Sequence, residues 1–92
     1  MGIEVSLTLS KDSINLGETV TATYSCTGAY DTLIWSDNMP NQMDLGPGDQ
    51  NGTMKFLPTW SGTYTITIFG NGDISKSDAF ASEFTTATVT VN

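Results

Sequence analysis

Apolar and polar residues alternate with a period of two in four separate segments, and this pattern constrains the fold more than any other feature. The segments are IEVSLTL (3–9), ETVTATYSC (18–26), GTYTITIF (62–69) and TATVTV (86–91). Such alternation places one side of a β-strand against a core and the other side in water. Because β-branched residues are abundant and Asn-Gly pairs interrupt the chain before a long helix can form, the sequence predicts an all-β fold.

Turn-forming residues separate these segments at the intervals that a small sandwich needs. Asn15 and Gly17 precede the second long segment, and the pairs Asn51-Gly52 and Asn71-Gly72 suit tight turns. A chain of 92 residues has room for one core. We therefore expect a single domain over 1–92, an antiparallel β-sandwich of about seven strands in two sheets. The stretch from 38 to 52 is expected to be a long loop with room for one short strand.

Four stretches in this order resemble a known family of sandwiches. LGETVTATYSC, LIW, SGTYTITI and ATVTV resemble strands B, C, F and G of immunoglobulin-like domains. They are equally similar to the bacterial and viral PKD-like and Big-type modules, which share the sandwich without its disulfide. The resemblance leaves out the segments 38–52 and 70–83, and the loop after LIW lacks the Gly-Asp-Gly turn usual in PKD domains. It implies an immunoglobulin-like fold and says little about function.

The resemblance also implies roles for individual residues. Trp35 matches the core tryptophan of strand C, and Tyr64 matches a tyrosine whose hydroxyl bonds the backbone a few residues upstream. Tyr24 and Ile66 occupy the two disulfide positions, although a slip of one residue pair would place Cys26 at the first. In either register packing replaces the disulfide, and Cys26 is expected to be a buried free thiol. The predicted core consists of Val20, Tyr24, Trp35, Tyr64, Ile66, Ile68, Val89 and Val91.

The last alternating segment contains a conflict of phase. Its inward residues are odd-numbered from Ala87 onward, whereas the apolar residues just upstream are Phe80 and Phe84. A change of phase within one strand needs an extra residue. We therefore expect a β-bulge near Thr85 and Thr86.

Composition excludes several classes of function. The chain has three lysines or arginines against ten acidic residues, a net charge of -7, so nucleic acids and anionic membranes are not expected partners. With no histidine and one cysteine, Ser-His-Asp catalysis, zinc clusters and disulfides within the chain are impossible. We expect no enzymatic activity and no cofactor. A set of acidic and amide side chains offers the oxygen ligands that calcium prefers, but its spacing fits no EF-hand, and a solvated loop is the preferred interpretation. The set consists of Asp31, Asp37, Asn38, Asp44, Asp49 and Asn51.

Two aromatic residues and one long connection are candidates for binding. Trp60 and Tyr30 are least explained by strand alternation, and an exposed aromatic can stack on a sugar or anchor a protein interface. The alternative for Trp60 is that it covers one end of the core beside Pro58. Immunoglobulin-like topology places the connection over 70–83 at the same end as Tyr30. The contact surface predicted at this end consists of Tyr30, Asp31, Asp73, Lys76 and Phe80.

In this arrangement the segment 38–52 lies at the side or at the opposite end. The competing interpretation of the 70–83 connection is a hairpin extension that Ile74 and Phe80 pack onto the sandwich.

These expectations combine into one functional hypothesis and one alternative. The first is a non-catalytic module of a larger bacterial surface protein or phage virion protein, tethered to other domains and acting as a spacer or weak adhesion domain. Its partners would be proteins or glycans on a cell or virion surface. The alternative is a carbohydrate-binding module that uses Trp60 or Tyr30 as a platform. No segment is apolar enough to insert into a bilayer.

Overall fold

The computed structural model describes residues 3–37, 43–72 and 82–92, and within them every regular element is a β-strand. The long strands coincide with the four alternating segments of the sequence, because alternation lets one face of each strand be buried while the other remains solvated. The strands are β1 (Glu4–Leu9), β2 (Ser13–Ile14), β3 (Val20–Thr27), β4 (Asp31–Ser36), β5 (Met43–Pro47), β6 (Gln50–Phe56), β7 (Gly62–Asn71) and β8 (Ser82–Val91).

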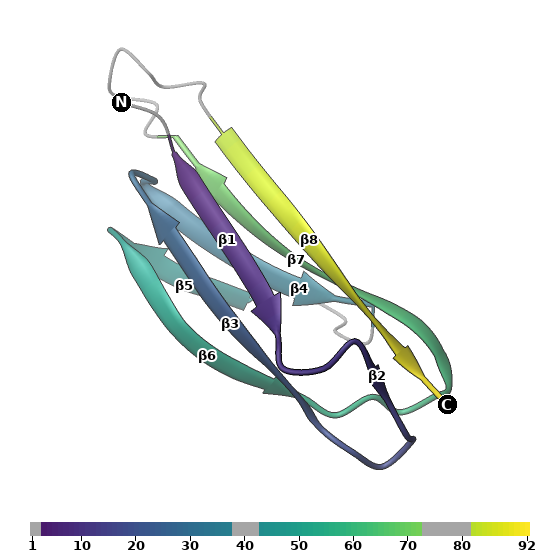
Figure 1. Ribbon diagram of the computed structural model, residues 1–92. Coiled ribbons are helices and arrows are strands. Elements are labelled where there is room, and N and C mark those ends of the chain that lie inside the picture. Colours follow the sequence, from purple (N-terminus) through teal and green to yellow (C-terminus); the bar gives the residue numbers. More distant parts are fainter. Residues whose placement is uncertain (1–2, 38–42, 73–81) are drawn as a thin grey trace.

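The strands form two sheets that pack face to face (Figure 1). One sheet has the order β1-β3-β6, and the other has the order β2-β8-β7-β4-β5. In the second sheet β7 lies between β4 and β8, and in the first β3 lies beside β6, which are the neighbours expected for the B, C, E, F and G strands of an immunoglobulin-like sandwich. The expected all-β sandwich is confirmed. Among the described residues it has one parallel pair, in which β2 runs alongside the end of β8.

The core between the sheets consists of two clusters of buried side chains. The large cluster fills the end of the sandwich where β8 terminates, and the small cluster fills the end where β1 begins. Tyr24 and Leu7 are half-buried and pack against both clusters, so they connect the two. The large cluster consists of Ile14, Val20, Ala22, Ile34, Phe56, Tyr64, Ile66, Val89 and Val91. The small cluster consists of Ile3, Cys26, Ala29 and Ile68.

Most of the predicted core is confirmed, but the prediction that Trp35 lies in the core is wrong. Tyr24 faces inward and is half-buried, whereas Trp35 lies on the outer face of the five-stranded sheet, with its ring centroid 6.4 Å from that of Phe69. The inward residues of β4 are Thr32, Ile34 and Ser36. In the apolar run LIW both phases are compatible with a strand, and cross-strand packing selects the phase in which Ile34 faces the core. The other six predicted residues are buried: Val20, Tyr64, Ile66, Ile68, Val89 and Val91.

Cys26 is a free thiol and is completely buried, as predicted. It lies in the small cluster with Ile68, whereas Ile66 lies in the large cluster. Neither position expected to carry a disulfide is bridged, so this core is held together by side-chain packing.

The predicted bulge near Thr85 and Thr86 is absent. The register between β7 and β8 runs without interruption from Gly62 opposite Val91 to Asn71 opposite Ser82. Phe84 is therefore not shifted into the core: it faces outward and is 63% exposed. The irregularity lies instead between β4 and β5, where Leu45 is the extra residue.

Candidate binding surfaces

The turn that carries Tyr30 is fixed by two hydrogen bonds to other segments. The Gly28 N–H donates to the Asp49 carboxylate at 3.0 Å, and the Tyr30 N–H donates to the Asn71 carbonyl at 2.8 Å. Gly28 has a φ of 82°, a conformation that favours glycine and closes the turn. The Tyr30 side chain is 57% exposed. A fixed backbone with an exposed aromatic side chain is suitable for contacting a partner at low entropic cost.

Asp31 follows Tyr30 and forms a carboxyl pair with Asp44 of β5. The two lie on neighbouring strands, and Asp44 also accepts the Gly46 N–H at 2.8 Å. The pKa of Asp31 is raised, first because its side chain shares a hydrogen bond with Asp44, then because of partial burial, and then because of the negative charge of Asp44. Such a pair favours holding one proton or meeting a cationic group.

Only two residues of the predicted contact surface lie within the described part of the chain. Tyr30 and Asp31 are adjacent at one end of the sandwich, as expected. Asp73, Lys76 and Phe80, together with Ile74, lie outside the residues that the structure describes.

The segment 38–52 differs from its expected description. Its described part consists of β5 and the start of β6, joined at Gly48 and Asp49. Because Asp49 accepts the Gly28 N–H, this turn lies at the same end as Tyr30 and not at the opposite end. A glycine at 48 with a φ of 83° permits the tight reversal.

Trp60 lies at the opposite end of β7 from Tyr30. Its ring stacks on Tyr64 with centroids 4.0 Å apart and 21° between the planes, and it remains 43% exposed. The Tyr64 hydroxyl accepts the N–H groups of Thr59 at 3.0 Å and Trp60 at 2.9 Å, which confirms the expected bond to the upstream backbone. Gly62 makes room for the indole, because a Cβ there would lie 2.7 Å from the ring.

Trp60 covers one end of the core and is also exposed to solvent. One face of the indole closes the end of the core over Tyr64, and part of the ring stays in solvent. The ring is held in place by stacking and by the bonds to the Tyr64 hydroxyl, so its exposed part is a rigid apolar surface.

An apolar strip on the outer face of the five-stranded sheet was not predicted from the sequence. Phe69 of β7 lies opposite both Leu33 of β4 and Phe84 of β8, and Trp35 packs against Phe69 with an interplanar angle of 46°. The apolar strip therefore consists of Leu33, Trp35, Phe69 and Phe84. The signal was in the sequence: if Ile34 faces inward, Leu33 and Trp35 must both face outward.

Three of the aspartates considered as calcium ligands accept hydrogen bonds from the backbone. Asp37 accepts the Thr65 N–H at 2.8 Å, and Asp44 and Asp49 accept those of Gly46 and Gly28. Over residues 3–37, 43–72 and 82–92, no group of three or more acidic or cysteine side chains is positioned to hold a metal ion. Of the acidic residues considered as calcium ligands, Asp31 and Asp44 form a pair on neighbouring strands, and Asp37 and Asp49 bond to other segments.

No known protein-family model matches this sequence, and no curated protein matches it. In the part of the chain that the structure describes, no helix is long and apolar enough to cross a membrane.

Proposed function

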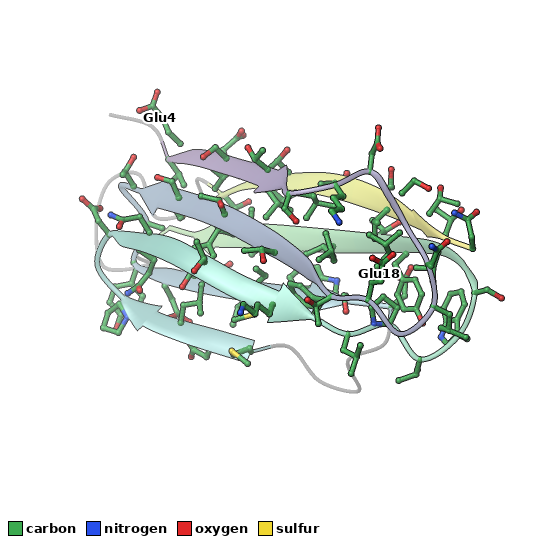
Figure 2. The ribbon with its side chains drawn as sticks, turned by 60° about the horizontal axis from the view of Figure 1, so that its bottom comes forward. Glu4 and Glu18 are labelled. Carbon is green, nitrogen blue, oxygen red and sulfur yellow. The ribbon has the colours of Figure 1, made fainter. Side chains whose placement is uncertain are left out.

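We propose that the protein is a non-catalytic immunoglobulin-like module of a surface-exposed bacterial or phage virion protein, acting as a spacer and weak binding domain. The observation that carries this proposal is the position of its ends. β1 begins at one end of the long axis and β8 ends at the other (Figure 1). The molecule measures 46 × 22 × 16 Å, so modules joined end to end would extend along their longest dimension. Figure 2 shows Glu4, where β1 begins, well apart from Glu18, which lies in the connection between β2 and β3.

The distribution of its residues supports the same proposal. The inward side chains are committed to the two core clusters, and the exposed aromatics Tyr30 and Trp60 lie at opposite ends of β7. Recognition on a sandwich commonly uses turns held by a rigid scaffold. The PKD-like or Big-type label belongs to this proposal, as do the extracellular location and the protein or glycan partners.

The test of the spacer role is a series of one, two and three copies joined head to tail and measured by small-angle X-ray scattering. A spacer predicts that each copy adds about one long dimension of 46 Å to the particle. Copies that fold back side by side, with little growth in length, would contradict it. Antibodies against the protein should also label intact cells or virions of its source.

A second candidate is carbohydrate binding, which the held and exposed ring of Trp60 favours. A rigid indole can stack on a sugar ring. Glycan-array binding should be lost in Trp60→Ala and retained in Leu57→Ala, an exposed apolar neighbour in the same loop. Tyr30→Ala tests the opposite end in the same assay. Circular dichroism must show that each variant is folded, and absence of binding to any glycan rejects this candidate.

A further inference from the structure

The outer edge of β8 is covered by β2 only near the C-terminal end of the strand and is open from Ser82 to Thr88. β2 pairs with β8 only at Thr90 and Val91. From Ser82 to Thr88 the only ladder partner of β8 among the described residues is β7, on the other side of the strand. We call the stretch Ser82–Thr88 the open edge.

Two hydrogen bonds establish which backbone groups point to this edge. The N–H of Thr90 donates to the Asp12 carbonyl at 3.0 Å, and that of Asn92 donates to the Ile14 carbonyl at 2.8 Å, both on the β2 side. Because backbone groups alternate along a strand, the even-numbered residues Phe84, Thr86 and Thr88 direct their N–H and C=O groups to the open edge.

A hydrogen bond in β7 confirms this phase. The Thr65 N–H points toward β4, where Asp37 accepts it, so the backbone N–H and C=O groups of the even-numbered residues of β7 point toward β8. Those residues pair with the odd-numbered residues of β8. Thr85 and Ala87 therefore bond to β7, and their even-numbered neighbours do not.

Burial changes at the same place along the strand. Val89 and Val91 face the core next to β2 and are buried, whereas Thr85 and Ala87 have the same inward phase and are only half-buried. Val5 and Leu7 of β1, the strand beside β8 in the other sheet (Figure 1), are also half-buried. The side of the sandwich is closed where a strand covers β8 and incompletely closed where none does.

The open edge lacks three of the features that natural sheets use to block pairing. It has no proline, no lysine and no bulge. The opposite edge of the same sheet, β5, is short and contains the bulged Leu45 and Pro47. The β5 edge is therefore the better protected of the two against strand addition.

We infer that the open edge is a site for β-strand addition by an extended segment of a different protein. The added segment continues the line of β2 and pairs with Phe84, Thr86 and Thr88. One side of it covers the half-buried Ala87 and Val5, and the other contacts the exposed ring of Phe84. The inference does not depend on the spacer role, and an unoccupied edge would leave that proposal standing.

Charge indicates the chemistry of the partner. Glu83 lies in the open edge, Glu4 begins the neighbouring β1, and neither strand contains a lysine or arginine. A second copy of the chain would bring another net charge of -7 to the same place. The partner segment is therefore one with alternating apolar residues and a positive charge.

The first test uses the free protein and hydrogen exchange measured by NMR. The amides of Thr86 and Thr88 should exchange with solvent much faster than those of Thr85 and Ala87, and the amide of Thr90 should be protected by β2. Uniform protection along β8 would overturn the assignment of an open edge.

The second test adds a probe, a synthetic peptide of alternating valine and threonine with a lysine at each end. At a concentration about ten times its Kd it should slow exchange at Thr86 and Thr88 by about tenfold, with no such gain at Thr85 or Ala87. A peptide with glutamate at both ends should bind more weakly, and one methylated at every backbone nitrogen should not bind. The inference fails if no peptide protects these amides, or if the methylated peptide binds equally.

A matched pair of variants separates edge pairing from folding. Thr86→Pro removes an N–H that β7 does not use and should leave the fold intact while abolishing peptide protection at Thr88. Ala87→Pro removes an N–H that bonds to β7 and should destabilise the sandwich. If analytical ultracentrifugation shows that the chain dimerises with these amides protected, the occupant is a second copy and the partner assignment is wrong.

Discussion

The two ends of the sandwich achieve burial in opposite ways. At the end where β8 terminates, the large cluster fills the space with bulky side chains, including Tyr64, Phe56 and Ile66. At the end where β1 begins, the sheets approach closely: a Cβ on Gly70 would lie 2.8 Å from Cys26 Sγ and 2.9 Å from Ile3 Cγ2. The first end should be sensitive to the removal of atoms and the second to their addition.

The largest effect is expected from Ile66→Ala in the large cluster. Ile66 is almost completely buried, and its truncation leaves a cavity that costs about 2–5 kcal/mol of unfolding free energy. Urea denaturation measures this loss. Ile66→Val, which removes one methyl group, should cost about 0.5–1.5 kcal/mol. Similar values for the two variants would contradict the view that this end depends on bulk.

Gly70→Ala tests the other end by adding a single methyl group. The new Cβ would be too close to Cys26 and Ile3, so the variant should lose about 1–3 kcal/mol of stability. Cys26→Ala removes one of the contacting atoms. The double variant should therefore lose less than the sum of the two single changes. Strict additivity in this double-mutant cycle would show that the predicted clash does not occur.

Tyr64→Phe tests the hydrogen bonds at the end where β8 terminates. The change leaves the N–H groups of Thr59 and Trp60 without their acceptor, at an expected cost of about 1–2 kcal/mol. Tyr24→Phe is the matched control and should change stability by less than about 0.5 kcal/mol. Trp60 fluorescence should also shift as its stacking partner loosens. Equal effects in the two variants would indicate that the hydroxyl of Tyr64 has no special role.

Thr32→Val, at the end where β1 begins, should stabilise the protein. Thr32 is completely buried, lies opposite Gly70, and its hydroxyl has no hydrogen-bond partner among the described residues. Valine has nearly the same shape without the polar group, so thermal unfolding should indicate a gain of about 1 kcal/mol. Thr67→Val, on the outer face, should have a smaller effect. A destabilised Thr32→Val would indicate that the hydroxyl is satisfied in solution.

The smallest effect is expected at the Asp31–Asp44 pair. Because the folded chain holds the Asp31 proton more tightly than the unfolded chain does, the pair favours folding at low pH and this contribution is lost as pH rises through the raised pKa. Asp31→Asn should therefore increase stability at neutral pH, and the gain should shrink as pH falls toward about 4, near the pKa of a free aspartate. Asp12→Asn, with the same change in net charge, is the control. A pH-independent difference would contradict the assignment.

The sequence by itself determined the features that depend on local alternation. Where polar and apolar residues strictly alternate, only one phase buries the apolar side, so the strands containing Val20, Ile66 and Val89 and the burial of Cys26 could be predicted. The hydrogen bonds that the Tyr64 hydroxyl accepts were predicted from the resemblance to immunoglobulin-like domains, and they join residues only four to five positions apart in the chain.

The tertiary structure decided every feature for which two local solutions were equally good. In the run LIW both phases are apolar, and the partners on β5 and β7 placed Ile34 inside and Trp35 outside. Phe84 faces outward because β8 keeps an unbroken register with β7, so no bulge brings it into the core. The open edge of β8 depends on the length of β2, a strand of two residues too short for any periodic pattern. Side-chain periodicity specifies which face of a strand is apolar, whereas long-range pairing specifies which residues pack on each face and which strand pairs with each edge.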